Sequence, residues 1–440
     1  MISFKNFGGQ LASKTLTSVF GLLFTDSLIK NGRKPENAKV PADFRPVLRF
    51  AAVSDIHLDG DENQAAAKRL GELFKDMYSY SDGQEYKGLD AVMVAGDFTG
   101  GGAEKQYEMF LKIIKEHKKE ETALLTVLGN HEFIDYRDED ATVGYKVYKK
   151  YISEEVDTHT VINGYHFIGV SYDDDGKSFT RKADWLRSEI ERAVKEDKKK
   201  PVFVFQHPAP TATIYGSINW GDADMRKVLN SFPQVIDFSG HSHYAPMDPR
   251  SVWQGAFTAV GCGSLAAFMG NLNYIDGDKD APGESGGFLL VEADEKGRVR
   301  ISIYDIVNHK FFPECEYFLT DISDTKKRTY TWHKNKAADT APVFGDGDVY
   351  VKKDGEGNSV LLFPEARGRY SAENYKIKVT DTAGKAVFEN TVISGYVRTD
   401  SVQCEVNLGK PASGKYKAVI KAYSPYAKHG GTLKKDIEIK

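Results

Sequence analysis

The stretch "VLRFAAVSDIH", residues 47–57, joins a run of apolar residues to a polar cluster that contains Asp55 and His57. The apolar part has the length of a strand and shows no alternation, which is typical of a strand covered on both faces. The polar cluster follows directly, so it lies at the carboxyl end of that strand, where open α/β sheets bind ligands. This stretch therefore predicts a buried strand that ends in chemically active side chains.

The same pattern recurs along the first 245 residues. The later runs are "LDAVMVAGDF" (89–98), "ALLTVLGNHE" (123–132), "YHFIGVSYDD" (165–174), "PVFVFQHPAP" (201–210) and "VIDFSGHSH" (235–243). Segments with helical spacing lie between several of them, and Leu70, Leu73, Phe74 and Met77 form one apolar stripe. This alternation predicts an α/β fold with helices on the faces of a sheet.

The chain has 440 residues, which is too long for one ordinary core, so two or more domains are expected. After residue 250 the helical patterns fade. Residues 321–345 are polar and unperiodic, which predicts a linker. Beyond it, "NYKIKVTDTAGKAVFEN" (374–390) and "GKYKAVIKAYS" (414–424) alternate between apolar and polar residues, as in a small β-sandwich of immunoglobulin or fibronectin type. We expect an N-terminal segment at 1–45, an α/β domain at 46–320, the linker at 321–345 and an all-β sandwich at 346–440.

Bulk charge and cysteine content limit the partners and the compartment. A net charge of −4 gives no electrostatic reason to expect nucleic acid or an anionic membrane. Three well-separated cysteines imply no disulfide framework, which mildly favours a reducing, cytoplasmic location. Secretion is the alternative, because "LTSVFGLLF" (16–24), preceded by Lys5 and Lys14, resembles a signal peptide. This run is too short to span a bilayer, and we favour a helix packed on the domain.

The polar clusters at the predicted strand ends contain five of the 11 histidines. Their members are Asp55, His57, Asp97, Asn130, His131, Glu132, His207, His241 and His243. Any one cluster is explained by an ordinary turn, and "GHSH" alone leaves a metal pair and a turn equally open. Together they predict a metal centre, because burying such groups without partners costs several kcal/mol each and an ion supplies one shared partner.

In order, the blocks D-x-H, G-D, G-N-H-E, H and G-H-x-H resemble those of the calcineurin-like metallophosphoesterase superfamily, over roughly residues 49 to 265. The resemblance implies a four-layer αββα sandwich with a dinuclear metal centre. It implies that Asp97 bridges two ions, that Asp55, His57 and His243 complete one site, and that Asn130, His207 and His241 complete the other. Mixed oxygen and imidazole ligands suit Mn, Fe or Zn.

The resemblance also implies a phosphoester hydrolase in which a metal-bridging hydroxide attacks phosphorus in line. His131 fits as the general acid that protonates the leaving group, oriented by a carboxylate such as the first-block Asp55. Glu132 would support neighbouring ligands. Purple acid phosphatases resemble this set, but they carry a tyrosine where this chain has Gly100 and lack the histidine that stands here as His57. That variant is not expected.

The substrate is less closely defined by the sequence. D-x-H together with G-N-H-E resembles cyclic-nucleotide phosphodiesterases, which slightly favours a small or nucleotide-like phosphodiester over a phosphomonoester. Tyr215 or Trp220 in the loop 211–224 could contact a base, although a structural loop is the more common explanation, and a surface ion pair is the expected role of Arg250. A different class stays open, in which the chain is a catalytically silent metal-containing binding or scaffold protein. Its C-terminal domain could bind a polymer or another protein.

Overall fold

The computed structural model describes residues 40–268, 285–312, 315–394 and 403–440, which divide into two compact units. Among these residues the first unit contains 40–268 and 286–335, and 336–440 belong to the second. The signal-like run 16–24 and most of the predicted N-terminal segment lie outside the described residues. Within the described ranges, none of the helices combines the length and apolar character needed to cross a membrane.

The first unit is built on two β-sheets. The first has the order β12-β11-β10-β1-β2-β3, with β13 paired to β11, and the second has the order β4-β5-β6-β7-β9-β8. The strands of the first are β1 (Pro46–Val53), β2 (Ala91–Val94), β3 (Ala123–Thr126), β10 (Gly287–Asp294), β11 (Val299–Asp305), β12 (Lys310–Phe311) and β13 (Tyr317–Leu319). Those of the second are β4 (Thr158–Ile162), β5 (Tyr165–Gly169), β6 (Val202–Gln206), β7 (Val235–Ser239), β8 (Val252–Gln254) and β9 (Thr258–Gly261). Parallel pairing joins β1, β2 and β3 in one sheet and β5, β6, β7 and β9 in the other.

The two sheets pack face to face through aromatic side chains. The ring of Phe50 on β1 lies 5.0 Å from those of Phe167 on β5 and Phe203 on β6, and 5.8 Å from that of Phe238 on β7. All four rings are fully buried. This shared core explains why the apolar runs show no alternation, since one face of each strand meets the other sheet and the opposite face meets helices.

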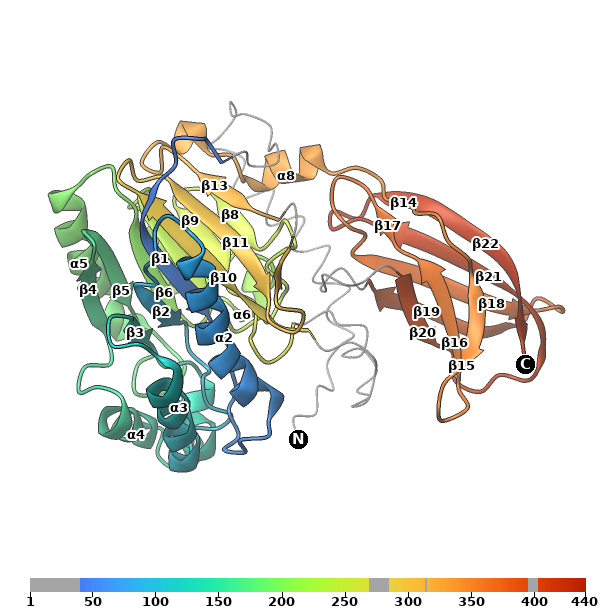
Figure 1. The fold of residues 1–440 in the computed structure, drawn as a ribbon, viewed down its shortest axis with the longest axis horizontal. Helices are drawn as coiled ribbons and strands as arrows, with labels where there is room; N and C mark the ends of the chain where they lie inside the picture. The colour runs from blue at the N-terminus through green and yellow to red at the C-terminus, as the bar shows by residue number, and fades with distance from the viewer. Residues whose placement is uncertain (1–39, 269–284, 313–314, 395–402) are drawn as a thin grey trace. The chain divides into compact units, whose positions relative to one another are not determined.

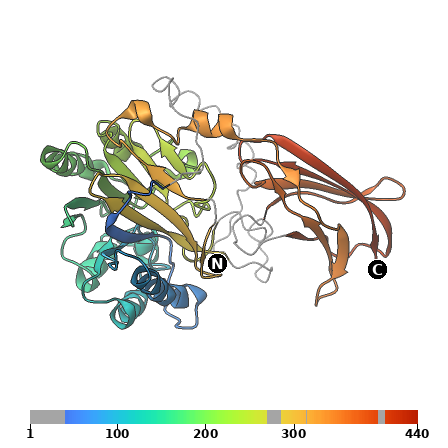
Figure 2. The ribbon, with the colours of Figure 1, turned by 45° about the horizontal axis from the view of Figure 1, so that its top comes forward.

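Helices cover the outer faces of the two sheets (Figure 1). The longer ones are α2 (Ala65–Asp82), α3 (Glu104–His117), α4 (Thr142–Tyr151) and α5 (Ala183–Glu196), and the shorter ones are α6 (Ser217–Trp220) and α7 (Ala223–Leu229). Helix α2 packs on the first sheet, where Tyr80 meets Phe311 of β12, and α5 packs on β5 and β6 of the second. Turning the view leaves these two helices on different sides of the strands (Figure 2). The predicted four-layer αββα architecture is confirmed.

The structure differs from the sequence prediction within residues 321–345, the predicted linker. This segment contains η4 (Thr325–Lys327), α8 (Trp332–Ala338) and β14 (Val343–Phe344). Arg328 is only 2% exposed, and its guanidinium donates to the carbonyl of Pro233 at 2.7 Å. The side chain of Gln254 on β8 accepts the backbone N–H groups of Thr329 and Tyr330. Polar residues here are buried through hydrogen bonds to the backbone, which the absence of an apolar pattern does not reveal.

The second unit is all β. Its sheets have the orders β14-β17, β15-β16-β20 and β19-β18-β21-β22, and all strand pairs are antiparallel. The strands are β15 (Tyr350–Lys353), β16 (Ser359–Pro364), β17 (Ala366–Arg367), β18 (Asn374–Asp381), β19 (Ala386–Ile393), β20 (Gln403–Asn407), β21 (Gly414–Tyr423) and β22 (His429–Ile439). Phe363 on β16 and Tyr375 on β18 meet edge to face at 5.0 Å within the core. Contact between two sheets through buried aromatic rings is the packing of a β-sandwich.

Candidate metal centre

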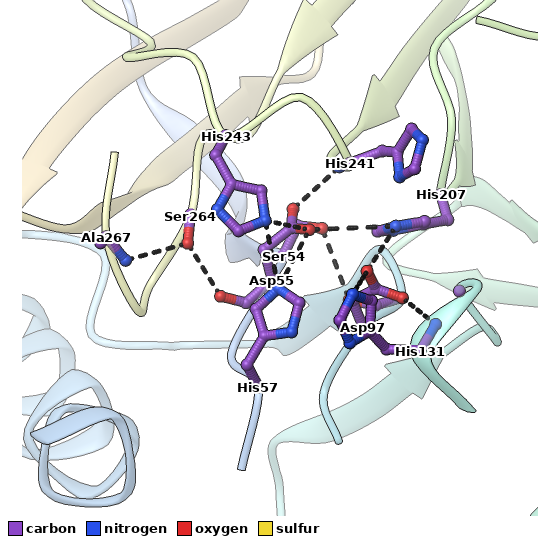
Figure 3. Close-up of polar contacts among 12 residues, drawn as sticks. Ser54, Asp55, His57, Asp97, His131, His207, His241, His243, Ser264 and Ala267 are labelled. Carbon is purple, nitrogen blue, oxygen red and sulfur yellow. Dashed lines mark hydrogen bonds and ion pairs between the residues drawn. The ribbon is translucent and has the colours of Figure 1, made fainter. Parts of the chain in front are cut away.

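The polar clusters of the sequence meet at the carboxyl ends of strands from both sheets (Figure 3). Asp55 and His57 follow β1, Asp97 follows β2, and Asn130 and His131 follow β3; His207 follows β6, and His241 and His243 follow β7. Seven of these eight residues form three overlapping groups in which the ligand atoms lie within 4.8 Å of one another. The eighth, Asn130, directly precedes His131. The structure therefore places every predicted ligand at one edge of the sandwich.

The first group contains Asp55, His57 and His243. The Nε2 atom of His243 lies 3.0 Å from Oδ1 of Asp55 and 3.1 Å from Nε2 of His57. The Nε2 atom of His57 is 3.6 Å from the same carboxylate oxygen. Two imidazole nitrogens and a carboxylate oxygen thus point at one small volume, which is the arrangement that a transition-metal ion requires.

A second group contains Asp97, His207 and His241. The Nε2 atom of His207 lies 2.9 Å from Oδ2 of Asp97 and 3.9 Å from Oδ1 of Asp55. The rings of His207 and His241 are 5.0 Å apart and roughly perpendicular. Asp97 also belongs to the third group, with His57 and His131. It is therefore the carboxylate that connects the two halves of the centre.

Three buried atoms of this cluster have no hydrogen-bond partner among the described residues. They are Oδ1 of Asp55, Oδ1 of Asn130 and Nε2 of His207, although the first lies 3.0 Å from Nε2 of His243 and the last 2.9 Å from Oδ2 of Asp97. Each unpaired buried polar group costs about 1–3 kcal/mol. A shared cation would satisfy all three at once, and two carboxylates, an amide oxygen and imidazoles are ligands suited to Mn, Fe or Zn. The residues present therefore fit a metal centre.

The backbone is strained at the same residues. Five of the ten non-glycine residues with positive φ in the described chain are predicted ligands. They are Asp55, His57, Asp97, His241 and His243, with φ between 52° and 67°. Each such residue costs of order 1–3 kcal/mol, and strain of this kind concentrates where side-chain direction matters more than stability. Asp and His tolerate this conformation better than most residues, but no sequence pattern predicted it here.

Three of the predicted ligands use one polar atom for orientation and present the other to the centre. Asp55 accepts the backbone N–H of His241 at Oδ2, at 2.9 Å, which leaves its Oδ1 facing the histidines. The backbone N–H of His131 donates to Oδ1 of Asp97 at 2.8 Å, which leaves Oδ2. Nδ1 of His207 contacts the carbonyl of Ala95 at 2.8 Å, and a carbonyl can only accept, so Nδ1 carries a proton and Nε2 is the atom that faces the centre.

Glu132 holds the loops after β2 and β3 together. It is fully buried, and its carboxylate accepts the backbone N–H groups of Asp97, Thr99 and Gly129 at 3.0, 2.9 and 2.6 Å. The hydroxyl of Thr99 adds a fourth bond. Burial, and then the charge of Asp97, raises the pKa of Glu132 to about 7. Glu132 thus positions the backbone that carries the predicted ligands.

His131 differs from expectation in its orienting partner. Its Nδ1 lies 2.8 Å from the carbonyl oxygen of Gly100, where the resemblance implied a carboxylate such as Asp55. The carbonyl requires the proton on Nδ1, so Nε2 faces the centre, 3.9 Å from Oδ2 of Asp97. Burial lowers the pKa of the His131 imidazole. The loop after β2 forms this carbonyl contact, and residue spacing alone does not reveal it.

The histidines of the cluster offset the negative charges of the Asp55 and Asp97 carboxylates. Burial disfavours charge on His207, but the carboxylates of Asp97 and Asp55 outweigh it and raise the pKa of His207 to about 9. Burial and the neighbouring His207 charge lower the pKa of His241 to about 4. Burial alone would raise the pKa of Asp55, yet the nearby histidines hold it well below its ordinary value. A protonated His207 therefore serves as counter-ion, and a metal ion would displace that proton.

Two glycines make room for the two carboxylates. A Cβ atom on Gly129 would collide with the Asp97 carboxylate and with its backbone nitrogen, and one on Gly240 would collide with Ser54 and Asp55. The backbone after β3 therefore approaches Asp97 more closely than any side chain would permit. Glycine in the blocks G-N-H-E and G-H-x-H is required by this close approach.

We predict that Gly129→Ala lowers phosphoester turnover at least about 100-fold, because displacing Asp97 disturbs ligand geometry. Bound metal, measured by elemental analysis, should fall in parallel. Gly355→Ala is the matched control, since a Cβ there meets nothing within 4 Å. Full activity in Gly129→Ala would show that the position of Asp97 is not critical.

The loop 211–224 contains Tyr215 and Trp220, the two aromatic residues considered for contact with a substrate base. Tyr215 is buried, with its ring stacked 3.8 Å from that of Tyr244 and the Arg250 guanidinium 3.6 Å from its centre. Both faces of Tyr215 are therefore covered, which favours the structural explanation. The ring centre of Trp220 lies 6.1 Å from that of Tyr244. Arg250 pairs with Asp248 as the sequence suggested, but the pair is buried instead of on the surface.

Among the comparisons with known proteins, one family model matches the part of the chain that carries these residues. Residues 48–245 match the family model of the calcineurin-like phosphoesterases. No curated protein matches the chain. A purple acid phosphatase from yellow lupin (Lupinus luteus) seeds shares 14% identity over 68% of this chain and 57% of its own, with a TM-score of 0.44. A glycosyl hydrolase family 2 member from Bacteroides cellulosilyticus shares 10% over 89% and 62%, with a TM-score of 0.22.

Proposed function

We propose, because residues 48–245 match the family model of the calcineurin-like phosphoesterases, that the chain hydrolyses a phosphoester with two metal ions. One ion would be held by Asp55, His57 and His243. The other would be held by Asn130, His207 and His241, and Asp97 would contact both ions. The observation that carries the proposal is the convergence of ligand residues from five strand ends on one edge of the sandwich, where three buried polar atoms lack a hydrogen-bond partner. Mn, Fe and Zn fit the ligand set.

When bound, a pair of such ions activates water and polarises a phosphoryl oxygen. The chain's own residues supply orientation and a proton. Glu132 and the backbone of His131 fix Asp97, and the backbone of His241 fixes Asp55. His131 would hold a proton at Nε2 and donate it to the leaving oxygen, while Gly100 keeps the ring in place.

The choice between ester classes rests on the sequence resemblance to cyclic-nucleotide phosphodiesterases. We therefore propose a small or nucleotide-like phosphodiester as the first substrate class and a phosphomonoester as the alternative. Within the described residues, the loop 211–224 buries Tyr215, so only Trp220 of the two aromatic residues considered there keeps a role in base contact as a proposal.

The test is turnover of bis-p-nitrophenyl phosphate beside p-nitrophenyl phosphate by purified protein with added Mn²⁺. We expect turnover that disappears on chelation and returns with metal, with a higher kcat/KM for the diester. A higher kcat/KM for the monoester would reverse the substrate class. Bound metal without turnover of either ester would contradict the hydrolase and favour a binding protein.

A further inference from the structure

Arg137 lies beside the proposed centre and has no part in the chemistry above. It ends η1 (His131–Tyr136), the short 3-10 helix that starts at the proposed acid. Its side chain is exposed and returns to the start of that helix, where Nη2 lies 3.4 Å from the carbonyl oxygen of Asn130. Asn130 is a proposed ligand, so the guanidinium lies next to the centre.

This arginine is not engaged by the acidic residues around it. Asp135, Asp138, Glu139 and Asp140 are its neighbours in sequence, yet no ion pair joins it to a carboxylate in the described part of the chain. Other cations of nearby segments are paired: Lys146 with Asp140, Arg181 with Asp174 and Lys182 with Asp157. A surface arginine in acidic sequence that stays unpaired keeps its donors for another anion.

We infer that Arg137 binds a non-bridging oxygen of the substrate phosphoryl group at the edge of the metal centre; this rests on the proposed function. The guanidinium presents a planar fork of donors that matches phosphate oxygens. Its attraction grows with the charge of the anion, so a dianionic phosphomonoester gains more than a monoanionic diester. Arg137 therefore contributes to the choice between the two ester classes.

The test compares Arg137→Gln with Lys146→Gln in the Mn²⁺-loaded protein. Glutamine at 137 retains one amide donor but loses the charge and the fork of donors, and Lys146→Gln removes a charge from the same surface. For Arg137→Gln we expect kcat/KM to fall about 10- to 100-fold for p-nitrophenyl phosphate and less for the diester. Binding of inorganic phosphate, measured by calorimetry, should weaken by a similar factor. Lys146→Gln should change either quantity less than about twofold.

Metal content and melting temperature separate phosphate binding from a structural role, and we expect both to stay unchanged in Arg137→Gln. Loss of metal or of melting temperature, unaltered phosphate affinity, or an equal effect in Lys146→Gln would each overturn the inference. If wild-type protein binds phosphate in an Arg137-dependent way but hydrolyses no ester, the anion site stands and the proposed function fails. If wild-type protein hydrolyses esters and Arg137→Gln has the same kcat/KM, the inference about Arg137 fails and the proposed function stands.

Discussion

Replacement of Asp97 with asparagine is expected to lower kcat/KM for phosphoesters by about 10³-fold or more, with loss of bound metal. Asp97 belongs to two of the three ligand groups, and its carboxylate is the one that connects them. Loss of several kcal/mol of transition-state stabilisation corresponds to this factor. The variant should still fold, because asparagine can accept the N–H of His131 and tolerates the φ of 53° at this position.

The measurements are steady-state kinetics with both p-nitrophenyl esters, elemental analysis and circular dichroism. Asp59→Asn is the control, since Asp59 is an exposed carboxylate shortly after the β1 ligands. Wild-type metal content together with wild-type turnover in Asp97→Asn would contradict the shared-ligand role. Metal loss at one site only would assign Asp97 to that ion alone.

The meeting of these residues was predictable because it follows from topology. Continuous apolar runs indicated strands buried on both faces, and parallel strands bring their carboxyl ends to one edge. Asp55, Asp97 and His207 were therefore expected to be neighbours although up to 152 positions separate them, and Oδ1 of Asp55 lies 3.9 Å from Nε2 of His207. The burial of Phe50 between the two sheets follows from the same pattern.

The parts that escaped prediction depend on contacts that no local pattern encodes. The four donors of Glu132 come from the loops after β2 and β3, and the carbonyl partner of His131 also lies in the loop after β2. The stacking of Tyr215 on Tyr244 needs two loops to meet, and the burial of Arg328 depends on carbonyls about 70 and 95 positions away. Such pairings are fixed by tertiary packing, and polar segments that satisfy their own hydrogen bonds resemble linkers in sequence.

The second large effect concerns the leaving group. We expect His131→Ala to retain both metals and to lower kcat about 10²- to 10³-fold for an alkyl phosphoester, but less than tenfold for a p-nitrophenyl ester. An alkoxide needs a proton as it departs, whereas p-nitrophenolate is stable without one. Kinetics over a series of aryl and alkyl esters would give the dependence of kcat on leaving-group pKa, which should steepen in the variant.

This dependence distinguishes the acid from the other role open to His131. Its imidazole also belongs to a group with His57 and Asp97, so it lies within range of an ion as well as of a leaving oxygen. A ligand would be needed for every ester alike, and its removal would reduce bound metal. His309→Ala is the control, because His309 is exposed and pairs with Asp76 on α2. Equal loss for activated and unactivated esters, with metal depleted, would make His131 a ligand. Selective loss with metal retained requires a proton donor. Because the Gly100 carbonyl holds one proton on Nδ1, the transferred proton is a second one, carried on Nε2 of the imidazolium.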